Sequence, residues 1–128
     1  MFKAKDIMIT DVISVKPKTP IYDAIRTMVD NNITGLPVVN DDMTLAGIIS
    51  EKDVLQLLYS YEDLKCEGKV ENFMTTTVVA FDLDENLIAV CNCLLKNNFR
   101  RVPVLANGKL IGIITRKDII KYIIEPIK

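Results

Sequence analysis

The sequence contains no histidine and only three cysteines, Cys66, Cys91 and Cys93. Without histidine, a zinc site would need four thiolates or carboxylates, and no second cysteine pair is present to supply them. An odd number of cysteines favours reduced thiols over a disulfide framework. Cys91 and Cys93 are two positions apart in a helical pattern, so their side chains should point to different faces. We therefore expect structural thiols and no metal site.

Long apolar runs and long basic runs are also missing. No apolar segment approaches the ~20 residues of a membrane span, and no signal core follows the first residues, so we expect a cytoplasmic chain without membrane contact. The net charge is −1 and the basic residues form no long run, which argues against a nucleic-acid partner. No nucleophile elbow, phosphate loop or outstanding carboxylate pair is present, so we expect no enzymatic activity, no catalytic residue and no obligatory cofactor.

The chain is organised as an internal repeat. Residues 47–53 (GIISEKD) return 65 positions later as residues 112–118 (GIITRKD). Upstream the offset is 66, so Met8 matches Met74 and Pro37 matches Pro103. The offset changes inside a turn, where it disturbs no strand register. We divide the chain into a first repeat at 1–60, a linker at 61–69 and a second repeat at 70–128.

Each repeat is expected to follow the order β-α-β-β-α. Short strands are expected at 12–15, 36–39 and 45–49, and again at 78–81, 102–105 and 110–114. Thr19 and Pro20 are expected to be the N-cap and first residue of a helix, Ser50 and Thr115 to open helices, and Asn107-Gly108 to form a hairpin turn. The earlier helix of each repeat has an apolar face at i, i+3, i+4, i+7 and i+8: Ile21, Ala24, Ile25, Met28, Val29 and Leu87, Val90, Cys91, Leu94, Leu95.

The central strands are apolar runs, which suggests that both faces of each sheet are buried. One repeat is too small to bury such a sheet comfortably. We therefore predict an α+β fold in which two pseudo-symmetric repeats pack through their sheets into one globule. The residues before each proline differ between the repeats: Thr34-Gly35 in the first and Arg100-Arg101 in the second.

Residues 47–53 and 112–118 are the two signature segments. Each contains a signature turn, at 50–53 or 115–118, in which a hydroxyl residue and an aspartate lie three residues apart where a strand becomes a helix. One interpretation is a capping box, in which the acid stabilises the helix start. The other is a nucleotide contact, in which the helix start binds phosphate and the aspartate accepts from the two vicinal hydroxyls of a ribose. Local sequence leaves both open for Ser50 with Asp53 and for Thr115 with Asp118.

The pattern resembles a tandem pair of cystathionine-β-synthase (CBS) domains, a stand-alone Bateman module. The resemblance covers essentially the whole chain and occurs twice in register. It rests on the two GII[ST]xKD segments, the proline strand 35–39, the helix start Thr19-Pro20, and the lead-in residues Met8, Thr10 and Met74-Thr75.

The resemblance implies that each ligand pocket is built from both repeats. One pocket would use Thr10, Ile13, Thr34, Gly35, Thr115 and Asp118. The other would use Ser50, Asp53, Thr76, Val79, Arg100 and Arg101. The arginine pair suits bidentate phosphate binding, and a solvated pair at a strand end is the alternative. Ile9 stands where the second repeat has Thr75, so the two pockets need not be equally occupied.

The resemblance also implies a function. We expect a regulatory ligand-sensing module that binds AMP, ADP, ATP or S-adenosylmethionine in the cleft between the repeats. Relatives dimerise through helical faces, so we expect a homodimer that acts on an unidentified regulated protein. The surface would draw on Val54, Leu55, Leu58, Ile119, Ile120 and Ile123. The alternative is a scaffold that dimerises or binds proteins without any ligand.

Overall fold

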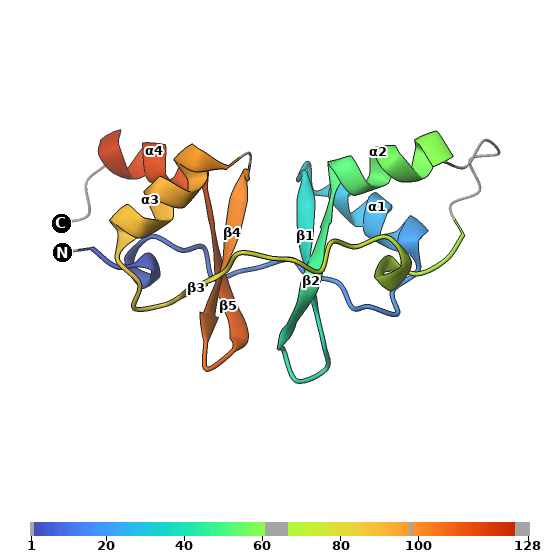
Figure 1. Cartoon of the computed structure of the whole chain (residues 1–128), viewed down its shortest axis with the longest axis horizontal. Helices are drawn as coiled ribbons and strands as arrows, with labels where there is room; N and C mark the ends of the chain where they lie inside the picture. Colours follow the sequence, from blue (N-terminus) through green and yellow to red (C-terminus); the bar gives the residue numbers. More distant parts are fainter. Residues whose placement is uncertain (1, 61–66, 98, 125–128) are drawn as a thin grey trace. The chain divides into compact units, whose positions relative to one another are not determined.

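The structure is a computed structural model that describes residues 2–60, 67–97 and 99–124 (Figure 1). Cys66, Asn98, Pro126 and positions 61–66 of the expected linker lie outside the described residues. No helix in the described ranges is long and apolar enough to cross a membrane. The elements in chain order are the 3-10 turn η1 (Ala4–Asp6), α1 (Ile21–Asp30), β1 (Gly35–Val39), β2 (Leu45–Ser50), α2 (Glu51–Ser60), the 3-10 turn η2 (Val70–Asn72), β3 (Phe81–Asp82), α3 (Leu87–Lys96), β4 (Arg101–Ala106), β5 (Lys109–Thr115) and α4 (Arg116–Ile124).

The chain divides into two compact units. The central unit is Ile13–Val78, and the terminal unit combines Met1–Val12 with Val79–Lys128. Each unit has one small sheet, with both of its helices on the same side of that sheet (Figure 1). This arrangement confirms a mixed fold of two related repeats.

The sheets of the two units have the same internal plan. In the central unit, β1 and β2 form an antiparallel hairpin in which Gly35 lies opposite Ser50. In the terminal unit, β4 and β5 form the corresponding hairpin, with Arg101 opposite Thr115. Its two-residue turn, Asn107-Gly108, has positive φ at both positions, as expected for this hairpin turn.

Each hairpin is paired along one edge with a residue from the other sequence repeat. Thr75 bridges Ile48 at the β2 edge of the central unit, and Ile9 bridges Ile113 at the β5 edge of the terminal unit. Both bridges carry two backbone hydrogen bonds, of 2.8 and 2.9 Å at Thr75 and of 2.8 and 3.0 Å at Ile9. The lead-ins are residues 1–12 of the first repeat and residues 70–78 of the second. Each lead-in is thus part of the compact unit that holds the hairpin of the other repeat.

The strands expected at 12–15 and 78–81 are shorter than predicted. Val15 makes a single parallel bridge to Val38, and β3 contains only Phe81–Asp82. Proline explains both limits, because a parallel ladder extending upstream from these pairs would need the N–H groups of Pro37 and Pro103, which proline lacks. Each proline therefore ends the parallel pairing along its own strand, β1 for Pro37 and β4 for Pro103.

The apolar faces predicted for α1 and α3 are confirmed at their first four positions (i, i+3, i+4 and i+7). The prediction is wrong at the fifth position, i+8. In α1, Ile21, Ala24 and Met28 are buried and Ile25 is half-buried, whereas Val29 is 72% exposed. In α3, Cys91 is half-buried and Leu95 is 84% exposed. At about 100° per residue, position i+8 lies about 80° from position i, at the margin of the stripe. Burial therefore falls off on that side of both helices.

The start of α1 also differs from the prediction. The helix begins at Ile21, and Pro20 occupies the cap position without a side-chain hydrogen bond. The hydroxyl of Thr19 instead accepts a hydrogen bond of 3.0 Å from the backbone N–H of Lys16. The backbone N–H of Thr19 donates back to the carbonyl of Lys16 at 3.0 Å. Thr19 therefore closes the preceding turn and is not available to cap the helix.

Each unit has its own hydrophobic core. The central core is centred on Ile21, Leu36, Val38, Ile49, Leu57 and Val70. The terminal core is centred on Ala4, Leu87, Val90, Val102, Val104 and Ile114. Ala4 and Val70 are fully buried residues of the two lead-ins, so each lead-in contributes to a core as well as to a sheet edge.

Candidate functional site

Both signature turns form a complete capping box. The backbone N–H of Ser50 donates to Oδ2 of Asp53 at 2.9 Å, and the backbone N–H of Asp53 donates to Oγ of Ser50 at 3.4 Å. The same pair of bonds joins Thr115 and Asp118, at 2.9 and 3.2 Å. The hydroxyls also donate to Oδ2 of their aspartates, at 2.9 and 2.8 Å. The capping interpretation is confirmed, and it engages only one oxygen of each carboxylate.

The pre-proline residues lie beside the signature turn of their own repeat. In the central unit, the backbone N–H of Glu51 donates to the carbonyl of Thr34 at 2.9 Å, next to the Gly35–Ser50 pair. In the terminal unit, the backbone N–H of Arg116 donates to the carbonyl of Arg100 at 3.2 Å. The fold therefore gathers the hydroxyl, the aspartate and the pre-proline pair at one end of each hairpin.

The predicted site residues are divided evenly between the units. The central unit holds Ile13, Thr34, Gly35, Ser50, Asp53 and Thr76. The terminal unit holds Thr10, Val79, Arg100, Arg101, Thr115 and Asp118. Ile13 and Val79 are exposed apolar side chains, at 40% and 41%. The assembly of these two sets into pockets that draw on both units stays a prediction.

The two helix starts carry opposite charge. The backbone at the start of α4 brings together Arg100, Arg101, Arg116 and Lys117, and Asp118 is the one acid in the signature segment. The equivalent positions at α2 are Thr34, Gly35, Glu51 and Lys52, followed by Asp53. The start of α4 is therefore the more favourable of the two for an anion.

Arg116 has a structural role at this site. Its Nη2 atom donates to the carbonyl of Leu94 at 3.2 Å and to the carbonyl of Asn97 at 3.0 Å. These carbonyls belong to the last turn of α3 and the residue after it, where a cation is favourable. Arg116 therefore joins the end of α3 to the start of α4.

Thr75 is a residue of the site that the sequence analysis did not assign. Its hydroxyl donates a hydrogen bond of 3.0 Å to Oδ1 of Asp53, the oxygen that the capping box leaves unused. The matching position in the terminal unit is Ile9, which has no hydroxyl. The repeat alignment already paired Ile9 with Thr75, but the exchange of lead-ins was needed to place Thr75 beside Asp53.

The glycine that opens each signature segment makes room for the lead-in. A Cβ atom on Gly47 would lie 2.6 Å from the carbonyl oxygen of Thr75. A Cβ atom on Gly112 would lie 2.6 Å from the sulfur of Met8 and 3.0 Å from its Cβ. The motif therefore requires glycine because another segment crosses the strand at van der Waals distance.

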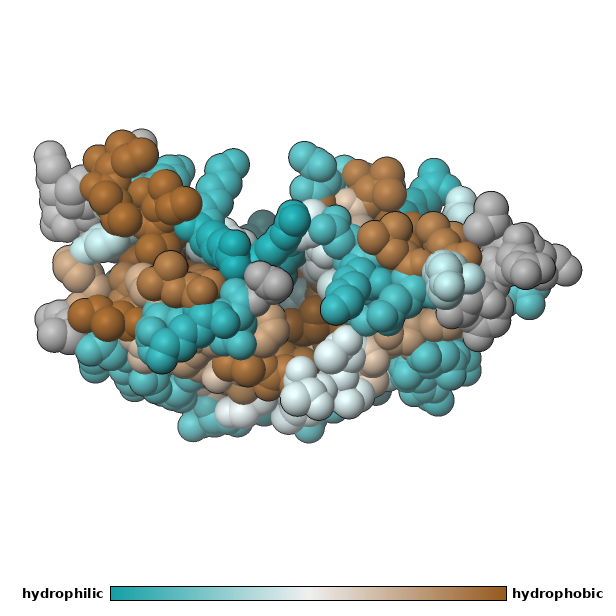
Figure 2. Space-filling model, turned by 45° about the horizontal axis from the view of Figure 1, so that its top comes forward, coloured by the Kyte–Doolittle hydropathy of each residue, from teal (hydrophilic) through white to brown (hydrophobic). Residues whose placement is uncertain are grey.

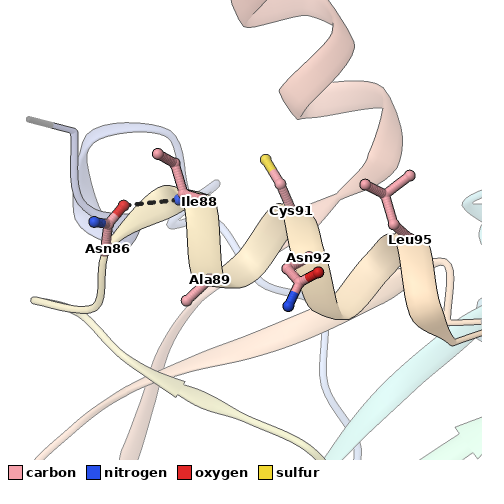
Figure 3. A pocket seen from close by; sticks show the side chains of 6 residues that line it. All are labelled: Asn86, Ile88, Ala89, Cys91, Asn92 and Leu95. Carbon is pink, nitrogen blue, oxygen red and sulfur yellow. Dashed lines mark hydrogen bonds between the residues drawn. The ribbon is translucent and has the colours of Figure 1, made fainter.

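An open depression lies along α3 (Figure 3). Its lining residues are Asn86, Ile88, Ala89, Cys91, Asn92 and Leu95, and none of them is a predicted site residue. Asn86 caps the helix by accepting from the backbone N–H of Ile88 at 2.8 Å. Cys91 and Cys93 are both free thiols and half-buried. Within the described ranges, no group of three or more potential ligands could hold a metal ion.

Comparison with known proteins gives matches along nearly the whole chain. A family model described as CBS domain matches residues 4–60 and 70–125. An uncharacterised protein of Methanocaldococcus jannaschii is 37% identical over 120 residues, which cover 93% of this chain and 42% of that protein. CBSX2, a chloroplastic CBS domain-containing protein of Arabidopsis thaliana, is 33% identical over 138 residues, which cover 87% of this chain and 58% of that protein. The chain thus spans about half the length of these two relatives.

Two solved structures resemble the chain closely. The crystal structure of CBSX2 in complex with AMP has a TM-score of 0.86 at 32% identity and covers 98% of both chains. The crystal structure of the CBS domain pair of protein MJ0100, in complex with 5′-methylthioadenosine and S-adenosyl-L-methionine, has a TM-score of 0.82 at 27% identity and also covers 98% of both chains. Both structures therefore contain adenosine compounds.

Proposed function

The chain belongs to the CBS domain family, and we propose that it is a regulatory module that binds an adenosine-containing ligand and catalyses no reaction. The observation that carries the proposal is the doubled signature turn. In each turn, the capping box leaves one carboxylate oxygen of the aspartate outside the cap. A carboxylate oxygen at a helix start suits the hydroxyls of a ribose, and the helix start itself suits phosphate.

The proposed pockets are the two sets named from the sequence. One combines Thr115 and Asp118 with Thr10, Ile13, Thr34 and Gly35; the other combines Ser50 and Asp53 with Thr76, Val79, Arg100 and Arg101. The exposed side chains of Ile13 and Val79 provide apolar surface for the adenine ring. Ligand classes that fit this chemistry are AMP, ADP, ATP and S-adenosylmethionine.

We further propose that the arginine pair favours a phosphorylated ligand in its pocket. Two guanidinium groups bind phosphate oxygens bidentately, whereas S-adenosylmethionine carries a positive sulfonium group that they would repel. The Arg101→Gln variant should therefore lose affinity for ATP more than for adenosine. Equal losses for both ligands would contradict a phosphate contact by this side chain.

A homodimer is the proposed assembly, and the exposed apolar residues of the helices support it. In α2, Leu55 is 63% exposed, and in α4, Ile120 and Ile123 are 58% and 72% exposed. Figure 2 shows hydrophobic side chains gathered over the helices of each unit. Val54 and Ile119, from the same predicted set, are partly buried and pack against the cores, as expected for some members of that set.

Sedimentation equilibrium tests the assembly. The wild type should be a dimer at micromolar concentration, and Ile123→Lys should weaken it, because a charge would enter an apolar contact. Lys121→Gln, a change at an exposed position on the same helix, is the matched control and should leave the dimer intact. A wild type that stays monomeric at tens of micromolar would contradict the proposed dimer.

Thermal denaturation with and without ligand tests the ligand proposal. Protein freed of bound nucleotide should be stabilised by adenosine ligands and not by GMP, by about 2.7 kcal/mol at one hundred times Kd. Asp53→Asn and Asp118→Asn, each compared with its own ligand-free form, should lose part of this shift. Asp23→Asn, which alters an exposed acid in the first turn of α1, should retain it.

The alternative is a ligand-independent scaffold, favoured by the capping role of both aspartates. A folded, nucleotide-free wild type that shows no shift with any adenosine ligand up to millimolar concentration would overturn the sensor proposal. A dimer that persists under those conditions would then support the scaffold.

A further inference from the structure

The two signature aspartates differ in how many hydrogen bonds they can still accept. A carboxylate oxygen accepts about two hydrogen bonds. In both aspartates, Oδ2 already accepts two, from the backbone N–H and the hydroxyl of Ser50 or Thr115. Oδ1 of Asp53 accepts a third bond, from the hydroxyl of Thr75. Among the described residues, Oδ1 of Asp118 accepts none.

The cause of this difference is a single pair of lead-in residues. Thr75 and Ile9 occupy the same place in their units, since each bridges the second residue of its signature segment, Ile48 or Ile113. The backbone bonds that fix them agree to within a tenth of an ångström. The side chain at this position therefore decides whether the neighbouring aspartate is occupied by a hydroxyl of the protein.

A vicinal diol offers two O–H donors. Oδ1 of Asp118 has acceptor capacity for both, whereas Oδ1 of Asp53 has capacity for one while the Thr75 bond is present. We propose that Thr75 makes the two ligand sites unequal, so that the ribose diol binds first at Asp118 and only weakly at Asp53. This inference rests on the proposed adenosine-binding function and adds its order of occupancy.

Exchanging the two side chains should exchange this property. Thr75→Val keeps the β-branched shape and removes the donor, so Oδ1 of Asp53 regains its full capacity. Ile9→Thr places a hydroxyl on an identically bonded backbone, where it can donate to Oδ1 of Asp118. Thr77→Val, which removes a hydroxyl from an exposed residue of the same lead-in that belongs to neither proposed pocket, is the matched control.

Isothermal titration calorimetry with AMP and 2′-deoxy-AMP is the test. The wild type should show one stronger site, at which loss of the 2′-hydroxyl weakens binding about tenfold, because one bond to a charged acceptor disappears. Asp118→Asn should abolish that site. Thr75→Val should strengthen the second site for AMP about tenfold and leave its affinity for 2′-deoxy-AMP nearly unchanged.

Ile9→Thr should weaken the stronger site for AMP by a similar factor, and Thr77→Val should reproduce the wild type. AMP binding that is within twofold of wild type in both Thr75→Val and Ile9→Thr would overturn the inference and leave the proposed function standing. Two equal sites in the wild type would overturn it as well. A folded wild type that binds no adenosine ligand would overturn both.

Discussion

The hydroxyl of Thr75 donates a 3.0 Å hydrogen bond to Asp53, across the boundary between the two sequence repeats. Thr75 belongs to the lead-in of the second repeat, and Asp53 belongs to the signature segment of the first. The contact exists because the lead-in crosses the edge of β2, where Thr75 bridges Ile48. The site chemistry of one repeat is thus influenced by a side chain of the other.

The crossing predicts a difference between the two glycines. Gly47→Ala should destabilise the protein by about 1–3 kcal/mol, because the new methyl group meets the carbonyl of Thr75 and that backbone is held by two hydrogen bonds. At Gly112 the new methyl group meets the side chain of Met8 instead. Urea denaturation of both variants gives the two costs.

Met8→Ala provides the control for this comparison. Combined with Gly112→Ala, it should cost less than the sum of the two single changes, because the clash has been removed. Met74→Ala should give less relief to Gly47→Ala, since the nearest obstacle there is the Thr75 carbonyl oxygen at 2.6 Å and the Met74 sulfur lies farther away, at 3.1 Å. Additive costs in the Met8 pair would show that the side chain is not the obstacle at Gly112.

Arg116→Ala should lower stability by about 1 kcal/mol, because two carbonyls near the end of α3 lose a cationic donor. Arg116→Lys should recover part of this loss, since an ammonium group retains the charge without the planar fork of the guanidinium. Lys117→Ala, at the next exposed position, should have a smaller effect. Thermal denaturation ranks the three variants, and equal losses for Arg116→Ala and Lys117→Ala would argue against the proposed role.

Asp84 gives a prediction on pH. A hydrogen bond and the charge of Lys5, with a smaller contribution from Lys3, hold the pKa of Asp84 below its ordinary value. A carboxyl with a lowered pKa contributes stability that is present above its ordinary pKa, at about pH 4, and is lost as pH falls through the folded value. NMR titration of the Asp84 carboxyl should therefore find a higher pKa in Lys5→Met than in wild type.

The same titration at high salt should also raise the pKa of Asp84, because the pair is exposed and screened by ions. Lys3→Met should raise it less than Lys5→Met, since the Lys3 nitrogen lies 3.5 Å from the Asp84 oxygen and the Lys5 nitrogen lies 3.2 Å from it. A pKa that is insensitive to Lys5→Met would contradict this assignment.

Two leucines of α2 differ in burial, because one packs in the core and the other lies on the proposed contact surface. Leu57 is 3% exposed, and Leu57→Ala should cost about 2–5 kcal/mol through loss of buried surface and the cavity that remains. Leu55 is 63% exposed, so Leu55→Ala should change monomer stability by less than about 0.5 kcal/mol. Denaturation at low protein concentration, where any dimer is dissociated, measures both, and a larger cost for Leu55→Ala would contradict its placement.

Much of the fold was predictable because each sequence pattern occurs twice, once in each repeat. The hairpins, the capping boxes at Asp53 and Asp118, and the Asn107-Gly108 turn depend on local chemistry that the sequence carries directly. The ends of the outer strands were not predictable in this way, because they depend on which N–H groups a neighbouring strand presents. Val29 and Leu95 were misassigned because helical periodicity gives the direction of a stripe and not the width of the surface that covers it.

The candidate site was likewise predictable from the sequence only in part. The signature residues and the difference at Thr34-Gly35 and Arg100-Arg101 are visible in the sequence. The role of Thr75 is not, because position 75 reaches Asp53 only through a non-local pairing of strands. Resemblance to a family supplied the expected ligand class, whereas the difference between the two acids came from particular contacts in this chain.

The exchanged lead-ins also set an order of folding during synthesis. All of the central unit, Ile13–Val78, is present once position 78 has left the ribosome. Residues 1–12 are made before the central unit, yet their partners begin at Val79, so this segment must wait until residues beyond position 78 have been translated. Its contacts close a long loop, which slows their formation relative to the local contacts of the central unit. Residues 1–12, which are synthesised before the central unit, are therefore placed after it.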